Sequence, residues 1–382
     1  TPAEVDPALL GRIDTCYSAA RSLLLSDPVR GYAFGLKALL LALDAGDPAR
    51  LVEGLAQVGC GMAIKGMKDG RLLVEQADAL ADELHLPHAR GMADLYIGYL
   101  RYTEARWRDA LTAWEGAARS LRRCLGVPNG IQKADVNVLM MLQALGDYPK
   151  MATVAMGTLE LARAKGNVYS EVMALLYHAM TRMAADDADG ALDSLRMSVS
   201  LAPDGRSHAF TALKFECKVA LYCGQPDDAY KRIQAAWADV KDSGFLDYPH
   251  FRIYYYSMRG GITLGRYLRT GEASLRTQVT QDAGRLAKEK LTFGRAHGRL
   301  LAAGLAQADE KTGEAGRLCR RAAEDFATTE MAAHAGAARR MAGILTADAA
   351  MVSTAEDVLA GCGIVNPARW ADAYTPGFRR PA

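Results

Sequence analysis

The chain has 382 residues, of which 50% are hydrophobic and 24% charged, with a formal net charge of +2 at pH 7. This is the balance of an ordinary folded, soluble protein. The near-neutral charge excludes the strongly basic surface that nucleic-acid binding needs, and no run of about eighteen apolar residues is present to cross a membrane. We therefore expect neither nucleic acid nor membrane as a partner.

In chain order, apolar residues recur at spacings of three and four, as in residues 72–84, which predicts one amphipathic helix after another. Short breaks separate these stretches and supply a helix stop, then Asp or Pro for the first turn of the next helix. They fall at residues 26–28, 46–48, 84–88, 126–130, 146–149, 202–205 and 224–228. We find no convincing strand.

The stretch GCGMAIKGMKDG, residues 59–70, places glycines around a lysine, as a phosphate-binding loop does. Gly61 and Gly66 have the P-loop spacing, but Met67 and Lys68 follow where that loop needs Lys and then Ser or Thr. We interpret the stretch as packing geometry, with Gly61 at the point where two paired helices press together.

The repeat signal is of the tetratricopeptide kind. That pattern wants Gly at position 8, Ala at 20, an aromatic residue at 24 and Ala at 27, and these offsets fall on Gly98, Ala110, Trp114 and Ala117. Residues that open each predicted second helix recur 37 to 44 residues apart, a looser period than the usual one of about 34. They are Ala33, Leu73, Ala110, Ala152, Ala191, Ala229, Ala273 and Ala315.

We therefore predict an all-α fold, an α–α superhelix. It is a tetratricopeptide-like solenoid of about eight helix pairs, with a period near 40 residues, in which each pair buries its apolar stripe against the next. The solenoid spans residues 1–362, and residues 363–382 form a C-terminal tail.

In such solenoids the first helix of each pair lines the inner curve. Methionine and tyrosine suit a surface that grips a partner, although they also serve in ordinary helix packing. Lys214 and Lys218 stand one turn apart, and lysines are seldom buried, which favours exposure on the inner curve. The predicted partner-binding residues are Tyr99, Tyr102, Asn137, Met141, Met180, Lys214, Lys218, Tyr255 and Met258.

The sequence gives little indication of a metal site, a cofactor site or a catalytic site. His85 and His88 have a metal-like spacing, but Leu86 and Pro87 interrupt any helix and no second ligand pair is present, so we predict a loop and no metal. We also predict no cofactor and no catalytic residue, because hydrolase, zincin and kinase motifs are absent.

Two further patterns have plain explanations. The acidic residues in AADDADG, residues 184–190, resemble paired catalytic acids, but we interpret them as a helix end and the next N-cap. The consecutive residues Tyr254, Tyr255 and Tyr256 must point to three sides of one helix, so most of that aromatic run is expected in packing. The seven cysteines include no Cys-x-x-Cys pair and indicate reduced thiols in the cytoplasm.

Four blocks of sequence resemble a known family. They are residues 27–56, residues 106–127, residues 221–237 and the closing residues 363–378. Within them, the pair Trp107 and Trp114, the segment 124–127 and the closing Asn366-Pro367-x-Arg369 are the least generic parts. These blocks resemble the C-terminal helical region of large bacterial serine/threonine protein kinases, in which a kinase domain and an AAA/STAND-type ATPase module precede tetratricopeptide-like repeats.

The resemblance implies a non-catalytic regulatory or recruiting arm of a signalling protein. Its partner would be a protein, a peptide or the upstream kinase and ATPase modules of the same polypeptide. The first residue is Thr1 and not Met, which fits a piece of a longer protein. Two alternatives stay open. One is a sensor with a closed pocket built around Asn137, Lys214 and Lys218, which binds a small effector; the other is an enzyme of unrecognised type.

Overall fold

A computed structural model describes residues 6–23, 27–124, 128–201, 206–376 and 378. These residues form nineteen α-helices and one short 3₁₀ helix, and no strand, which confirms the predicted all-α helical-repeat fold. The chain divides into two compact units, Thr1–Met141 and Leu142–Ala382. Among the predicted breaks, residues 26, 126–127 and 202–205 lie outside the described part of the chain.

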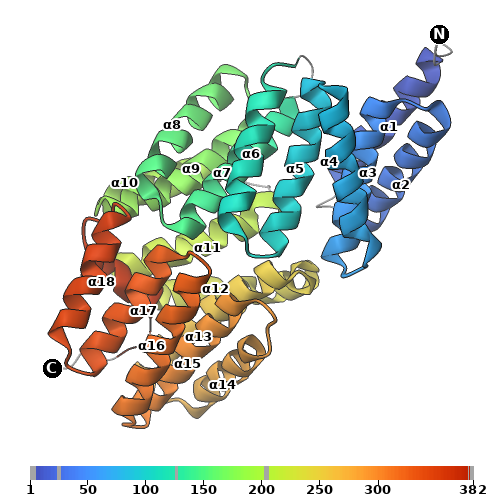
Figure 1. The fold of residues 1–382 in the computed structure, drawn as a ribbon. Helices are drawn as coiled ribbons and strands as arrows, with labels where there is room; N and C mark the ends of the chain where they lie inside the picture. Colours follow the sequence, from blue (N-terminus) through green and yellow to red (C-terminus); the bar gives the residue numbers. More distant parts are fainter. Residues whose placement is uncertain (1–5, 24–26, 125–127, 202–205, 377, 379–382) are drawn as a thin grey trace. The chain divides into compact units, whose positions relative to one another are not determined.

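The first unit packs its helices in consecutive antiparallel pairs, α1 on α2, α3 on α4 and α5 on α6 (Figure 1). The last helix of the unit, α7, continues four residues into the second unit. The bounds are α1 Pro7–Leu23, α2 Pro28–Ala45, α3 Pro48–Ile64, α4 Asp69–Leu84, α5 Pro87–Thr103, α6 Trp107–Leu121 and α7 Pro128–Leu145.

The second unit repeats the arrangement, with α9 on α10, α11 on α12, α13 on α14, α15 on α16 and α17 on α18. The 3₁₀ helix η1, Phe245–Asp247, precedes α13. The bounds are α8 Tyr148–Ala164, α9 Val168–Ala184, α10 Ala188–Leu201, α11 Arg206–Tyr222, α12 Pro226–Asp242, α13 Pro249–Thr270, α14 Ala273–Ala287, α15 Thr292–Ala308, α16 Thr312–Thr328, α17 Ala332–Leu345, α18 Ala349–Gly361 and α19 Pro367–Tyr374.

The eight residues predicted to open second helices all lie in the even-numbered helices α2 to α16. The pair of α17 and α18 follows the last of them, and α19 ends the described structure. No helix among the described residues is both long and apolar enough to cross a membrane.

Several helices begin and end at the Gly, Asp and Pro residues that the sequence predicts as helix boundaries. Gly46 adopts φ 62° at the end of α2, a left-handed conformation that glycine tolerates without strain. The next residue, Asp47, accepts a hydrogen bond from the Arg50 N–H and caps α3, whose first residue is Pro48. Asp147 caps α8 in the same way. Local sequence therefore sets where these helices begin and end.

The tetratricopeptide contact is present between α5 and α6. A side chain added at Gly98 would collide with the indole of Trp114, which is fully buried and donates from Nε1 to the Leu95 carbonyl over 3.0 Å. Ala110 and Ala117 are also fully buried. The small residues let the two helices approach closely around the tryptophan, as the pattern predicts.

The prediction for Gly61 is wrong by two residues. Residues 59–64 form the last turns of α3, and a Cβ at Gly61 would meet the ring of Tyr32 on α2, 2.9 Å away. The close approach of α3 to its partner α4 occurs instead at Gly59, where a Cβ would lie 2.7 Å from the Gly70 carbonyl oxygen and 2.7 Å from the Leu73 Cβ.

Gly59→Ala is therefore expected to destabilise the first unit by about 1–3 kcal/mol, because a backbone carbonyl has to move to admit the methyl group. Gly11→Ala, within α1, is the matched control. Nothing lies within 4 Å of its added methyl, so it should stabilise the same unit by about 0.5–1 kcal/mol. Urea denaturation followed by circular dichroism measures both, and equal effects would contradict the close approach at Gly59.

Candidate functional site

The helix α19 lies in the segment that the sequence analysis set apart as a tail. It packs against α11, α17 and α18 of the second unit. Trp370 is fully buried, with its ring 4.8 Å from that of Tyr148 and stacked 4.7 Å from that of Tyr374. The second unit therefore already holds one short helix through two aromatic side chains one turn apart.

A polar cluster holds the N-terminal end of α19. Asn366 caps the helix by accepting from the Arg369 N–H, and its Nδ2 donates to Asp186 over 3.1 Å. The Arg369 guanidinium donates to Asp186 over 3.0 Å and to the Tyr222 carbonyl over 2.8 Å. The Tyr222 hydroxyl also donates to Asp186, and that hydrogen bond is the largest cause holding the pKa of this carboxyl below its ordinary value. One aspartate therefore joins α19 to α11.

Two lysines of α11 stand one turn apart, and one of them, Lys218, lies beside the C-terminal end of α19. Lys218 Nζ donates to the Ala373 carbonyl over 3.1 Å and stands 4.0 Å from the centre of the Tyr374 ring. Lys214 Nζ donates to Gln143 over 3.1 Å and stands 4.6 Å from the ring of Tyr254 on α13. A cation at the C-terminus of a helix is favourable, because the unpaired carbonyls there carry partial negative charge.

Both lysines are partly buried. Burial lowers the pKa of Lys214 from 10.5 to about 8, and burial together with the charge of Lys214 lowers the pKa of Lys218 from 10.5 to about 7. In the part of the chain that the structure describes, neither ammonium has a carboxylate partner. At neutral pH these two groups are therefore partly deprotonated, unlike surface lysines.

Two histidines extend the same basic surface. His297 on α15 and His334 on α17 lie 5.7 Å apart between ring centres, and the His334 ring is 4.9 Å from that of Tyr374. Burial lowers the pKa of His297 to about 3, and it lowers the pKa of His334 well below the ordinary value of 6.5. The charges of Lys214 and Lys218 lower both further, so both imidazoles are neutral near pH 7.

These pKa shifts predict a pH-dependent stability. A lysine whose pKa is depressed in the folded state costs stability in full below its folded pKa, and that cost vanishes as pH approaches 10.5. Lys214→Met/Lys218→Met is therefore expected to be more stable than the wild type at pH 7. The difference should shrink as pH rises to 10, by at most about 1.4 kcal/mol per pH unit for each lysine.

Thermal or urea unfolding of both proteins between pH 6.5 and 10 measures this difference. Buried tyrosines and Cys217, whose pKa is raised to about 12, also titrate differently in the folded and unfolded states, but both proteins share them. A difference that stays constant with pH would show that the two lysines keep ordinary pKa values.

The structure gives the nine predicted partner-binding residues different surroundings. Met141, Met180, Asn137 and Tyr255 are buried, whereas Tyr99, Tyr102, Lys214, Lys218 and Met258 keep part of their surface exposed. Tyr99 and Tyr102 lie together on α5, with their rings 5.3 and 6.1 Å from Trp114. Of the nine, Lys218 contacts α19. The partner-binding role of the set stays a prediction.

The three consecutive tyrosines of α13 lie in three different surroundings, as their spacing predicts. Tyr255 packs in the core of α11 to α13 and donates to the Phe210 carbonyl over 2.8 Å, while Tyr254 faces Lys214. Tyr256 lines a polar surface pocket of about 290 Å³ between α12, α13 and α14.

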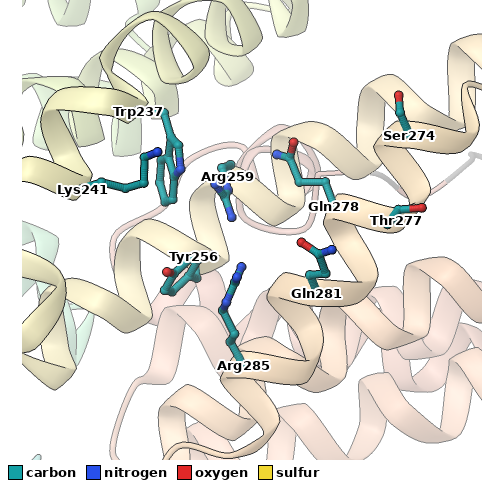
Figure 2. Close-up of a pocket in the computed structure, with 9 residues that line it drawn as sticks. All are labelled: Trp237, Lys241, Tyr256, Arg259, Ser274, Thr277, Gln278, Gln281 and Arg285. Carbon is teal, nitrogen blue, oxygen red and sulfur yellow. The ribbon is translucent and has the colours of Figure 1, made fainter.

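Figure 2 shows Trp237, Tyr256, Arg259 and Arg285 gathered at one end of this pocket, with Ser274 and Thr277 at the other. The Arg259 guanidinium lies 3.6 Å from the centre of the Trp237 ring and donates twice to Asp282, over 2.9 and 2.5 Å. The Arg259 guanidinium is therefore held in a buried ion pair.

The acidic cluster behaves in part as predicted. Asp187 Oδ1 accepts from the Gly190 N–H as an N-cap, whereas Asp186 joins α19 to α11. The described residues contain no group of three or more His, Cys, Asp or Glu side chains placed to hold a metal ion. All seven cysteines are free thiols.

These helix pairs and the close contact at Gly98 and Trp114 define a tetratricopeptide-like helical repeat protein. Among solved structures, that of a Rap protein complexed with competence and sporulation factor aligns with a TM-score of 0.64 and 10% sequence identity, over 94% of this chain and 100% of that chain. At this identity the likeness shows the fold alone. The TPR domain of P58(IPK) aligns over 95% of this chain and 96% of its own, at 11% identity, with a TM-score of only 0.23. No protein-family model and no curated protein matches the chain.

Proposed function

We propose that this chain is a non-catalytic protein-interaction scaffold whose second unit binds a helical segment of a partner. The observation that carries the proposal is α19, which shows that the side chains of α11, α17 and α18 accept a short helix. Binding of a helix in a groove through aromatic residues one turn apart is a common mode of peptide recognition. A partner would use this surface by displacing α19 or by extending it.

A synthetic peptide of residues 364–378 tests the proposal. It should bind to the full chain carrying Trp370→Ala/Tyr374→Ala, in which the resident helix has lost its two aromatic anchors, and it should bind the wild type much more weakly. The control peptide carries alanine at both aromatic positions and should bind neither protein. Fluorescence anisotropy measures binding, and circular dichroism checks that the variant stays helical. A helical variant that ignores the native peptide would contradict the proposal.

The finer proposal is that the scaffold is the C-terminal recruiting or regulatory arm of a cytoplasmic bacterial serine/threonine protein kinase. Its support is the resemblance of the Trp107 and Trp114 block and of the closing Asn366-Pro367-x-Arg369, whose Asn366 and Arg369 hold α19 in place. The partner would then be the kinase and ATPase modules of the same polypeptide. Calorimetry between those modules and this chain in trans tests this, and absence of heat at high concentration would contradict self-recruitment.

A second candidate function, sensing of a small effector, is favoured by a separate observation. Lys214, Lys218, His297 and His334 come together from three helices without a neutralising carboxylate among the described residues. The Rap structure was solved with a competence and sporulation factor, which shows that a protein of this fold can carry a second molecule. Asn137, the third polar residue predicted for such a pocket, is a buried residue of α7 in the first unit.

A further inference from the structure

The basic surface beside α19 is unusual because neither of its two lysines has a carboxylate partner among the described residues. Lys218 and Tyr374, Tyr374 and His334, and His334 and His297 form a continuous series of contacts, with distances of 4.0, 4.9 and 5.7 Å. The charges of both lysines act on both histidines. Each of these four basic side chains nevertheless keeps part of its surface accessible to solvent.

Burying an unpaired ammonium is unfavourable, and proteins generally pair such a group with a carboxylate or with a bound anion. The structure supplies only neutral acceptors here, the Gln143 amide for Lys214 and the Ala373 carbonyl for Lys218. An ammonium has three N–H groups, so each lysine keeps two for a ligand.

The two imidazoles also lack part of their hydrogen bonding. His297 Nε2 and His334 Nδ1 are inaccessible to solvent, and neither has a hydrogen-bond partner among the residues that the structure describes. Unsatisfied buried polar atoms next to two unpaired lysines are the features of a site that lacks its ligand. The ring of Tyr254, which is only partly buried, lies beside Lys214 and offers an apolar surface for the rest of such a molecule.

We propose that Lys214 and Lys218, with His297 and His334 behind them, form a binding site for the oxyanion group of a small ligand, a carboxylate or a phosphate. The two ammonium groups donate to the oxyanion, and the ring of Tyr254 contacts the carbon skeleton. This inference rests on the second candidate function, effector sensing, and is independent of whether the second unit binds a partner helix. Filling the site would add charge-assisted hydrogen bonds next to the C-terminal end of α19.

Isothermal titration calorimetry with sodium phosphate and with sodium citrate at pH 6.5, at constant ionic strength set with chloride, tests the site on the full chain. The variant Lys214→Met/Lys218→Met removes both donors and should fold, because it replaces buried charges by apolar chains of similar length. The matched control is Lys231→Met/Lys288→Met, which removes the same charge from exposed positions on α12 and at the C-terminal cap of α14.

We expect at least one of the two anions to bind the wild type and the control equally, with a tenfold or greater loss of affinity in Lys214→Met/Lys218→Met. Binding should also weaken from pH 6.5 to pH 9, as the lysines lose their protons. Equal binding to all three proteins, or no binding of either anion, would overturn the proposal.

A further binding experiment distinguishes the source of the oxyanion. A pentapeptide with a free C-terminal carboxylate and no acidic side chain is compared with the same peptide amidated at its C-terminus. Lysine-dependent binding of phosphate or citrate, with equal binding of the two peptides, assigns the site to a free small molecule. Preference for the free carboxylate assigns it to a peptide end. Failure of the anions to bind leaves the binding of the 364–378 peptide unaffected, so the two proposals fail separately.

Discussion

Replacing Trp370 by alanine should lower the free energy of unfolding of the second unit by about 3–5 kcal/mol. The indole is fully buried between the rings of Tyr148 and Tyr374, so its removal leaves a large cavity and two aromatic contacts unmade. The loss should be concentrated around α19, because a helical-repeat fold transmits damage mainly to neighbouring elements. The polar links of Asp186 to Asn366 and Arg369 would then be too few to hold the helix.

Urea denaturation followed by circular dichroism measures the loss, and Trp237→Ala is the control. Trp237 lies in the same unit but is only half-buried, at the edge of the surface pocket. Its removal should therefore cost less than that of Trp370. A second readout separates release of α19 from general damage. Once Tyr374 and Ala373 leave Lys218, that lysine regains water and its pKa should rise from about 7 toward 10.5. If the free energy of unfolding fell by less than 1 kcal/mol and the pKa of Lys218 did not change, α19 would be held by other contacts.

Local features of the fold follow directly from sequence. The helix pairs, the caps at Gly46 and Asp47, and the close approach at Gly98 and Trp114 all depend on residues that are near one another in the chain or at fixed repeat offsets. Periodicity and turn chemistry are sufficient for these. The error at Gly61 shows the limit, because the α3 and α4 pair meets at Gly59, and a repeat offset carried over from a stricter family cannot resolve a shift of two residues.

The candidate site was only partly predictable for a different reason. The spacing of Lys214 and Lys218, one turn apart, is visible in the sequence. His297, His334, Tyr374 and Asp186 reach the site from distant parts of the chain. Asp186 and Arg369 are 183 residues apart, and no periodicity connects them. The one signal was the closing Asn366-Pro367-x-Arg369, which is less generic than the rest of the repeats and proves to hold α19 at its N-terminal end.

A second large effect is expected at the buried ion pair of α13 and α14. Asp282 is fully buried, accepts two hydrogen bonds from Arg259 and receives a third contact from Arg285 at 3.1 Å. Asp282→Ala should lower the free energy of unfolding by about 3–5 kcal/mol, because the Arg259 guanidinium stays buried against Trp237 without its counter-ion. The loss of stability arises mainly because Arg259 stays buried without a counter-ion, and less from the lost attraction between Arg259 and Asp282.

A double variant separates the effect of the unpaired Arg259 charge from the effect of the lost attraction. Asp282→Ala/Arg259→Met removes both charges and should recover most of the lost stability, whereas a purely additive pair would lose still more. The control Asp193→Ala breaks the pair with Arg196, whose two side chains are 67% and 73% exposed, and should cost no more than about 1 kcal/mol. If the double variant were as unstable as Asp282→Ala, the aspartate would stabilise the second unit by a route other than neutralising Arg259, and α13 and α14 would depend on its hydrogen bonds alone.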